Sequence, residues 1–229
     1  MNPEASSVVN PTRPGPIGRL LRFRIAREGL PFLLPALVTL GLCLFLLHEP
    51  LRWLALIPGL LSFAIAGFFR DPHRVPPADE SLIVAPADGK VLQIESDGKT
   101  QRIAIFLSVF DVHINRAPYG GTAGAVEYRP GLFLAAWDKR CTAENEQTRI
   151  ELNTPHGVLR IAQIAGLIAR RIITKVASGQ IVERGVRIGL IRFGSRTELT
   201  LPSNAKVLCK IGDYVWGGET PLAQWNQPS

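Results

Sequence analysis

A glycine followed by a serine near the C-terminus, Gly194 and Ser195, is the pair whose residue types most directly suggest chemistry. Residues 186–193 before it and 197–202 after it alternate as strands do, so the pair is predicted to be held between two strands. Glycine leaves its carbonyl unhindered, and the serine hydroxyl can attack that carbonyl and turn the amide into an ester. Elimination and hydrolysis would then leave a pyruvoyl group at a new N-terminus. A Gly-Ser pair is also common in flexible turns, where it has no chemical role. The rest of the chain must therefore distinguish between a turn and a reactive pair.

A histidine and two aspartates supply candidate acid–base groups. His113 follows Asp111 at a spacing of two, which in a strand places both side chains on one face. Of the four histidines, His113 has the best setting for proton transfer near neutral pH. Asp88, within residues 85–90, could orient a histidine, although an aspartate before a glycine also marks an ordinary turn. Together with Ser195 these residues make an Asp, His, Ser order without the G-x-S-x-G motif of α/β hydrolases.

Arginines and a glycine near these positions are candidates for binding an anionic group. Arg116 lies three residues after the histidine, and its guanidinium could hold a phosphate or a carboxylate. Residues 165–172 contain Gly166, where the backbone could approach a ligand, followed by Arg170 and Arg171. Each of these arginines could equally be a solvated surface charge.

Charge and cysteine content narrow the class of protein. The formal net charge of the 229-residue chain is +7, which suits anionic partners. Five arginines in residues 13–27 precede the most apolar part of the chain, which favours a membrane over nucleic acid, and no nucleic-acid-binding motif is present. The three cysteines are far apart, without a C-x-x-C pair, so no metal site and no disulfide framework are predicted. They are Cys43, Cys141 and Cys209.

Two apolar runs, residues 30–47 and 53–69, are each near the length of a helix that crosses a bilayer. The connector between them is short, so they predict a transmembrane α-helical hairpin. Arginines flank both outer ends, which places those ends on the cytoplasmic face. A buried helical pair in a soluble domain is the alternative. A signal peptide is disfavoured because there are two runs and no clear cleavage site.

From residue 82 onward the pattern predicts many short strands, typical of a compact, mainly β sandwich or barrel. The predicted strands are 89–95, 102–109, 122–128, 148–152, 158–164, 186–193, 198–201 and 206–211. Residues 131–145 are predicted to be a loop or short helix. The chain is thus divided into a disordered basic tail (1–28), the hairpin (29–70), a proline-rich linker (71–81) and a catalytic domain (82–229).

Six motifs in this order give the chain a family resemblance. They are residues 68–72, 85–91, 110–118, 145–146, 163–172 and 193–198. With them the chain resembles the phosphatidylserine decarboxylase proenzymes of the short, bacterial and archaeal type. The resemblance implies decarboxylation of phosphatidylserine to phosphatidylethanolamine at the inner membrane of a bacterial cell, with the catalytic domain on the cytoplasmic face.

The resemblance also implies how the cofactor arises. The chain would cleave itself between Gly194 and Ser195 into a β chain (1–194) and an α chain (195–229) that begins with the pyruvoyl group. This covalent cofactor would form a Schiff base with the substrate amine and accept the electrons of the departing carboxylate. The two chains would remain a heterodimer, and association into a homo-oligomer is left open.

Residue roles follow from the same resemblance. His113 and Asp88 match positions associated with processing and proton transfer. Longer members of the family carry a second histidine at the position of Arg116, so His113 alone would serve both processing and turnover, or another group shares the work. Arg116, Gly166, Arg170 and Arg171 are the candidates for binding the substrate lipid.

Three other functions remain open from the sequence. Residues 207–222 have the turn rhythm of lipoyl-like domains, so the chain could be a membrane-tethered binding module without catalysis. It could act on another serine phospholipid, or use Ser195 as the nucleophile of a hydrolase. An intact chain after purification would support the binding module, whereas labelling by a fluorophosphonate without cleavage would support the hydrolase.

Overall fold

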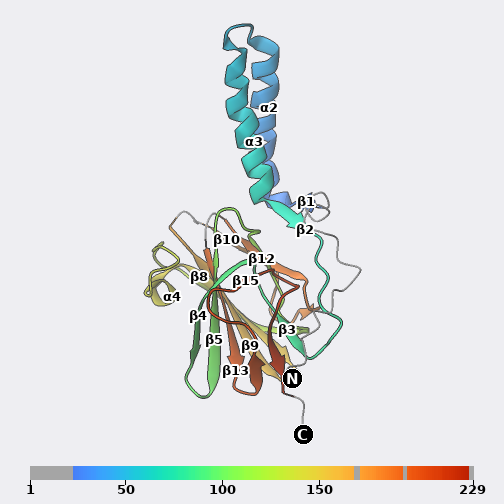
Figure 1. Ribbon diagram of the computed structural model, residues 1–229, viewed down its shortest axis with the longest axis vertical. Coiled ribbons are helices and arrows are strands. Elements are labelled where there is room, and N and C mark those ends of the chain that lie inside the picture. The colour runs from blue at the N-terminus through green and yellow to red at the C-terminus, as the bar shows by residue number, and fades with distance from the viewer. Residues whose placement is uncertain (1–22, 168–170, 193–194, 227–229) are drawn as a thin grey trace, which may run out of the picture.

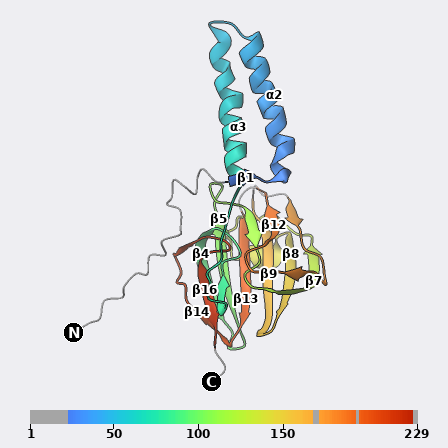
Figure 2. The same cartoon turned by 90° about the vertical axis from the view of Figure 1, so that its right-hand side faces the viewer.

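The structure, a computed structural model, describes residues 23–167, 171–192 and 195–226. Two helices project side by side from a β domain, as Figures 1 and 2 show from two directions. The predicted architecture, a mainly β domain preceded by an apolar helical pair, is confirmed. Strand β1 (Phe23–Ile25) and the 3-10 helix η1 (Arg27–Gly29) form within the segment that the sequence assigned largely to the tail.

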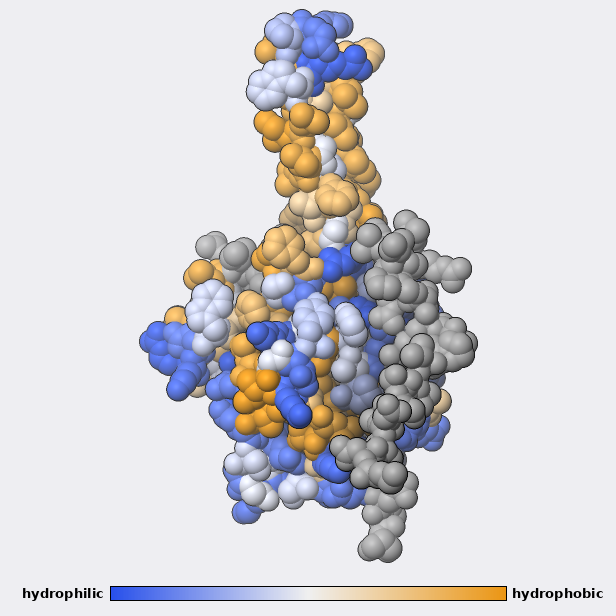
Figure 3. All heavy atoms as spheres, viewed as in Figure 1, coloured by the Kyte–Doolittle hydropathy of each residue, from blue (hydrophilic) through white to orange (hydrophobic). Residues whose placement is uncertain are grey.

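The helical pair consists of α2 (Leu30–Leu46) and α3 (Leu56–Phe68), joined through the 3-10 helix η2 (Leu51–Ala55). The apolar segments of 20 and 18 residues are long enough to cross a membrane, since each residue adds about 1.5 Å to a helix. Only 17% and 22% of their most apolar windows is buried. In the view of Figure 3, hydrophobic residues cover most of the length of the projecting pair and hydrophilic residues gather at its tip, which argues against a buried pair in a soluble domain.

An antiparallel ribbon closes the base of the helical pair. β1 pairs with β2 (Arg70–Pro72), so the chain enters and leaves the helices through neighbouring strands. The amide of Ala26 donates to the carbonyl of Phe69 at 2.8 Å. Gly29 is required here because a Cβ at that position would lie 2.5 Å from the Phe69 ring. The sequence predicted a linker from residue 71, but the structure continues β2 to residue 72.

An eight-stranded antiparallel sheet forms most of the β domain. Its strand order is β11-β7-β8-β9-β13-β5-β4-β15, and it curls into a half-barrel. The strands are β4 (Gly89–Ser96), β5 (Thr100–Leu107), β7 (Gly121–Arg129), β8 (Gln147–Thr154), β9 (Gly157–Ala165), β11 (Ile181–Val182), β13 (Ser195–Pro202) and β15 (Tyr214–Val215). The strand that begins at Ser195 therefore lies in the middle of the sheet, between β9 and β5.

Two three-stranded sheets complete the domain, in the orders β10-β12-β6 and β14-β16-β3. The first contains β6 (Ile114–Arg116), β10 (Ile172–Thr174) and β12 (Arg187–Ile191); the second contains β3 (Leu82–Val84), β14 (Ala205–Val207) and β16 (Pro221–Trp225). The short helix α4 (Cys141–Glu144) forms within the predicted loop or helix at 131–145.

The alternation of β13 separates two surfaces. Leu199 and Leu201 join the main apolar core, and Ser195 and Thr197 share their side of the strand. The intervening Arg196 and Glu198 point to the opposite face. We call the side of the sheet that faces the apolar core the inner face and the opposite side the outer face. The candidate Ser195 therefore lies on the inner face.

Two strand predictions need correction. The predicted strand at 206–211 ends at Val207, because the chain then turns: Lys210 N donates to the Asp213 carboxylate and Gly212 has φ +96°. The predicted strand at 198–201 is longer in the structure and reaches back to Ser195.

Candidate functional site

Ser195 is the first residue of β13 and is fully buried. Its Cα partners are Leu107 on β5 and Ala165 on β9. Within the described part of the chain, its Oγ has no hydrogen-bond partner. Since buried hydroxyls are usually paired, an unpaired one at the start of a central strand is a candidate reactive group. Gly194, its predicted partner in chemistry, lies outside the described residues, as does Arg170.

A row of neutral polar side chains lies beside Ser195 on the inner face. Asn115 Nδ2 donates to Thr197 Oγ1 at 3.0 Å, and Gln163 Nε2 donates to Asn115 Oδ1 at 2.7 Å. Thr174 Oγ1 donates to Gln163 Oε1 at 3.2 Å. This row fixes β6 against β9 and β13. The sequence analysis missed it, although a lone glutamine on the inward face of an apolar strand was a signal.

His113 directly precedes β6, and its carbonyl accepts from Ile191 N at 3.1 Å. β12 leads toward Ser195 and is antiparallel to β6, so His113 lies at the same end of the domain as Ser195. The His113 ring is buried and packs against the Phe68 ring, with centroids 4.3 Å apart. His113, the candidate general base, therefore lies next to the C-terminal end of α3.

Burial lowers the pKa of His113 to about 4, despite the opposing effect of the hydrogen bond to the Asp111 carbonyl. His113 Nδ1 lies 2.9 Å from that carbonyl oxygen. Because a carbonyl only accepts, the neutral ring carries its hydrogen on Nδ1, and Nε2 holds the lone pair. This is the protonation state of a general base.

Asp111 belongs to a turn and not to a strand, so the predicted shared strand face of Asp111 and His113 is wrong. Its carboxylate accepts from the amide of Ser108 at 2.8 Å and from the Tyr214 hydroxyl. The pKa of Tyr214 is raised by burial and by the Asp111 carboxylate. It is the backbone of Asp111, held by this turn, that orients the His113 ring.

Asp88 is buried beside β4 and binds two distant segments. Its Oδ2 lies 2.6 Å from Arg74 Nη2, and its Oδ1 accepts from Gly217 N at 2.7 Å. Burial raises the pKa of Asp88 to about 6, which outweighs the lowering effects of Arg74 and Gly217; the nearby charge of Asp111 also raises it. Asp88 thus connects the linker to the C-terminal segment of the chain.

The substrate-binding candidates have different surroundings. Arg116 is buried: its Nη2 lies 3.0 Å from the Asp71 carboxylate, and its Nη1 donates to the carbonyl of Gly185 at 3.0 Å. These contacts join β6 to β2. Gly166 is buried at the end of β9, whereas Arg171 is exposed. Their role in binding the substrate lipid stays a prediction.

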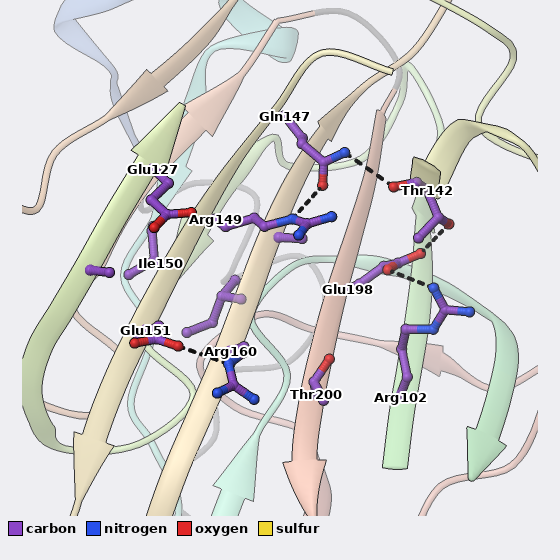
Figure 4. A pocket seen from close by; sticks show the side chains of 13 residues that line it. Arg102, Glu127, Thr142, Gln147, Arg149, Ile150, Glu151, Arg160, Glu198 and Thr200 are labelled. Atoms are coloured by element: carbon purple, nitrogen blue, oxygen red, sulfur yellow. Dashed lines mark hydrogen bonds and ion pairs between the residues drawn. The ribbon is translucent and has the colours of Figure 1, made fainter. Parts of the chain in front are cut away.

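A polar cavity of about 370 Å³ occupies the outer face of the sheet (Figure 4). There Glu198 accepts from Thr142 Oγ1 at 2.7 Å and pairs with Arg102, while Arg160 pairs with Glu151 at 2.8 Å. The side chains of Ser195 and Thr197 point to the other face. This cavity is therefore separated from the candidate serine by the sheet itself. Across the described residues, no cluster of histidine, cysteine and acidic side chains could hold a metal ion.

The sequence of the chain is similar to that of known proteins of one family over most of its length. A sequence model of the family described as phosphatidylserine decarboxylase matches residues 61–223. A phosphatidylserine decarboxylase proenzyme of Syntrophus aciditrophicus is 42% identical over 206 residues, which cover 86% of this chain and 96% of the relative. The proenzyme of the same name from Symbiobacterium thermophilum is 45% identical over 212 residues, covering 89% and 96%. The family match includes all the site residues predicted from the sequence.

Proposed function

Because the chain belongs to the phosphatidylserine decarboxylase family, we propose that it converts phosphatidylserine to phosphatidylethanolamine with a pyruvoyl group made from Ser195. The observation that carries this proposal is the buried hydroxyl of Ser195 at the start of a central strand, which has no hydrogen-bond partner among the described residues. A hydrolytic serine would need access to an external substrate and an oxyanion site before any chain cleavage. A serine that attacks its own backbone needs no access to an external substrate for that step.

The proposed maturation uses only groups of this chain and water. The Ser195 hydroxyl attacks the Gly194 carbonyl and gives its proton to a base, for which His113 Nε2 is the candidate. The amide breaks as an ester forms between Gly194 and Ser195 Oγ. Elimination then releases Gly194 as a carboxylate and leaves dehydroalanine at residue 195. Water converts this residue to pyruvoyl with loss of ammonia.

The sheet supports a heterodimer of the two products. β13 pairs with β5 from Ser195 to Pro202 and with β9 from Ser195 to Thr200. β16 pairs with β3, and β15 pairs with β4. The α chain (195–229) would therefore stay bound to the β chain (1–194) through four strand pairings after cleavage.

The inner face fits the group that maturation would produce. Residue 195 is buried between two neighbouring strands. In the proposed product its Oγ has left with the Gly194 carboxylate, its Cβ is a methyl group, and its Cα carries the ketone oxygen in place of the amide nitrogen. When bound, a pyruvoyl group supplies an electron sink for loss of a carboxylate. His113 is the proposed carrier of the proton that must reach the substrate carbon. Asp111 orients its ring, and Asp88 is a positioning residue that holds Arg74 and Gly217 in place.

A lipid substrate accounts for the position of this site. Phe68, at the end of α3, contacts the His113 ring, so the proposed base adjoins the apolar helical pair. We propose that the pair spans the bacterial inner membrane with the β domain on the cytoplasmic face, because arginines flank its outer ends. Gly166, Arg170 and Arg171 are the proposed binding residues. Arg116, engaged with Asp71, would hold the site together as well as serve in binding.

Intact mass spectrometry tests the proposal. Purified wild-type protein should give two fragments divided after Gly194, the smaller one beginning with pyruvoyl in place of serine. The Ser195→Ala variant should remain whole and should release no carbon dioxide from phosphatidylserine vesicles. A folded wild-type chain that stays uncut, with unmodified Ser195, would contradict the proposal and favour a binding module. Cleaved protein that acts on a different serine lipid would instead change only the substrate.

A further inference from the structure

A basic cavity of about 350 Å³ lies at the base of the helical pair. Arg24 and Arg27 approach it from the β1–β2 ribbon and η1, and Arg187 approaches from β12. Lys175 completes the set of cations, just after β10. The cavity is lined beneath by the apolar Ile114 and Leu190 and by Gly189.

The charges of this cavity are arranged in two layers. Asp71 has a side chain that is 0% exposed and pairs with Arg187, whose side chain is 42% exposed. Glu28, 15% exposed, pairs with Lys175 at 2.6 Å, and Lys175 is 37% exposed. The cavity therefore contains four cationic side chains and two carboxylates, and each carboxylate is more deeply buried than the cation with which it pairs. The surface offered to a ligand is positive, with an excess of two charges.

Two of the cations have no carboxylate of their own. Arg24 and Arg27 are exposed, and neither forms an ion pair with another residue that the structure describes. Among the described residues nothing occupies their guanidinium donors, and guanidinium groups match phosphate oxygens in geometry.

The position of the cavity identifies the source of the phosphate. α2 begins three residues after Arg27, and Asp71 lies in β2, three residues after the end of α3. If the apolar helices fill the hydrocarbon layer, the ribbon lies in the adjoining headgroup layer, which is roughly 5–7 Å thick on each side of the membrane. A lipid phosphate at that depth would meet these side chains.

This cavity is separate from the candidate catalytic site. Ile114 lines the cavity, whereas its neighbour Asn115 points the other way and binds Thr197 beside Ser195. Successive side chains of a strand face opposite sides, so β6 stands between the two sites. A lipid held in the cavity could not place its headgroup at Ser195.

We propose that this cavity binds the phosphate headgroup of an anionic membrane phospholipid that is not the lipid being decarboxylated. Bound there, the lipid would bridge the ribbon and the three-stranded sheet. It would thereby fix the β domain in one orientation against the membrane. This inference depends on the helical pair lying in a membrane and not on the proposed chemistry at Ser195.

Native mass spectrometry of the full chain in detergent micelles tests the inference, with phosphatidylglycerol as the probe and phosphatidylcholine as the neutral comparison. The wild type should retain one phosphatidylglycerol in preference to phosphatidylcholine. The variant Arg24→Gln/Arg27→Gln should bind it about 30-fold more weakly, because each basic residue near a lipid surface contributes about 1 kcal/mol. The variant Arg24→Lys/Arg27→Lys should retain most of the binding.

The matched control is Lys99→Gln/Lys206→Gln, which removes the same charge from two exposed residues at the opposite end of β13, near its turn to β14. It should bind phosphatidylglycerol like the wild type. Equal binding by the glutamine variant of the two arginines would overturn the proposal, as would equal retention of phosphatidylcholine. Displacement by inorganic phosphate at the same concentration would show a free-anion site and would also overturn it. If the double variant is unstable, Arg27→Gln alone should weaken binding about fivefold.

Discussion

The two faces of β13 differ in charge, although the residues that form them alternate along one strand. On the inner face, Ser195 and Thr197 are fully buried among neutral amides, and the nearby histidine is held uncharged. On the outer face, Arg196 and Glu198 are buried as an ion pair at 2.7 Å, with Arg102 nearby. Charge is thus confined to one side of a single strand. The neutral side is the one on which the Ser195 hydroxyl has no hydrogen-bond partner within the described part of the chain.

The largest expected effect comes from removing the base on the inner face. His113→Gln should slow self-cleavage by about 100-fold or more, because a positioned general base contributes roughly that much. Intact mass spectrometry of samples taken at intervals during synthesis of each protein measures the time course of fragment formation. His156→Gln, on an exposed hairpin turn, is the control and should cleave at the wild-type rate. Rapid cleavage of the His113 variant would remove this residue from maturation.

Breaking the neutral row should affect stability next. Asn115→Ala leaves Gln163 Nε2 and Thr197 Oγ1 without their present partner in a fully buried site. Such unsatisfied groups cost about 1–3 kcal/mol of unfolding free energy. Chemical denaturation in detergent, monitored by circular dichroism, gives that value. A change near zero would mean that water or a rearranged side chain replaces the amide.

Asp88 and His113 should give opposite pH dependences. Burial raises the pKa of Asp88 from 3.8 to about 6, so the folded state binds more protons there and loses stability as pH rises from 4 to 6. The pKa of His113 falls from 6.5 to about 4, so the unfolded state binds more protons and stability increases with pH from 4 to 6.5. In the wild type the two effects largely cancel.

Single variants should separate these effects. Asp88→Asn should leave the His113 contribution, so the unfolding midpoint should increase more steeply with pH between 4 and 6.5 than in the wild type. His113→Gln should leave the Asp88 contribution and give the opposite change of slope. Identical pH profiles of the unfolding midpoint for all three proteins would show that folding shifts the pKa of neither Asp88 nor His113.

The smallest effect is expected on the outer face. Glu151→Gln removes an ion pair with Arg160 whose side chain is 56% exposed. Exposed pairs contribute about 0–1 kcal/mol, so the free energy of unfolding should change by less than that and cleavage should be unaffected. A loss of unfolding free energy as large as that of the Asn115 variant would show that the two faces do not differ in this way.

The sequence predicted the long strands better than the short ones. β5 and β9 each have eight or nine residues with clear alternation, and both were predicted within a few residues. β2 and β6 have only three residues, and tertiary pairing with β1 and β12 defines them. No local pattern distinguishes such segments from a loop.

The candidate site shows the same division. Residue type and motif singled out Ser195, His113 and Asp88. They could not predict that Arg74 and Gly217 N would bind Asp88, because both approach from distant parts of the chain. Gln163 and Asn115 were missed for the same reason, since an amide reveals its partner only after β6 is placed beside β9.

The central position of β13 has a consequence for the order of events in the cell. Ser195 is buried only after β5 and β9, which both precede it in the chain, have paired on either side. Under the proposed chemistry, the peptide bond before Ser195 could break only in a molecule that has already assembled this sheet. Cleavage would then depend on correct folding, and a misfolded chain would remain an uncleaved precursor without the cofactor.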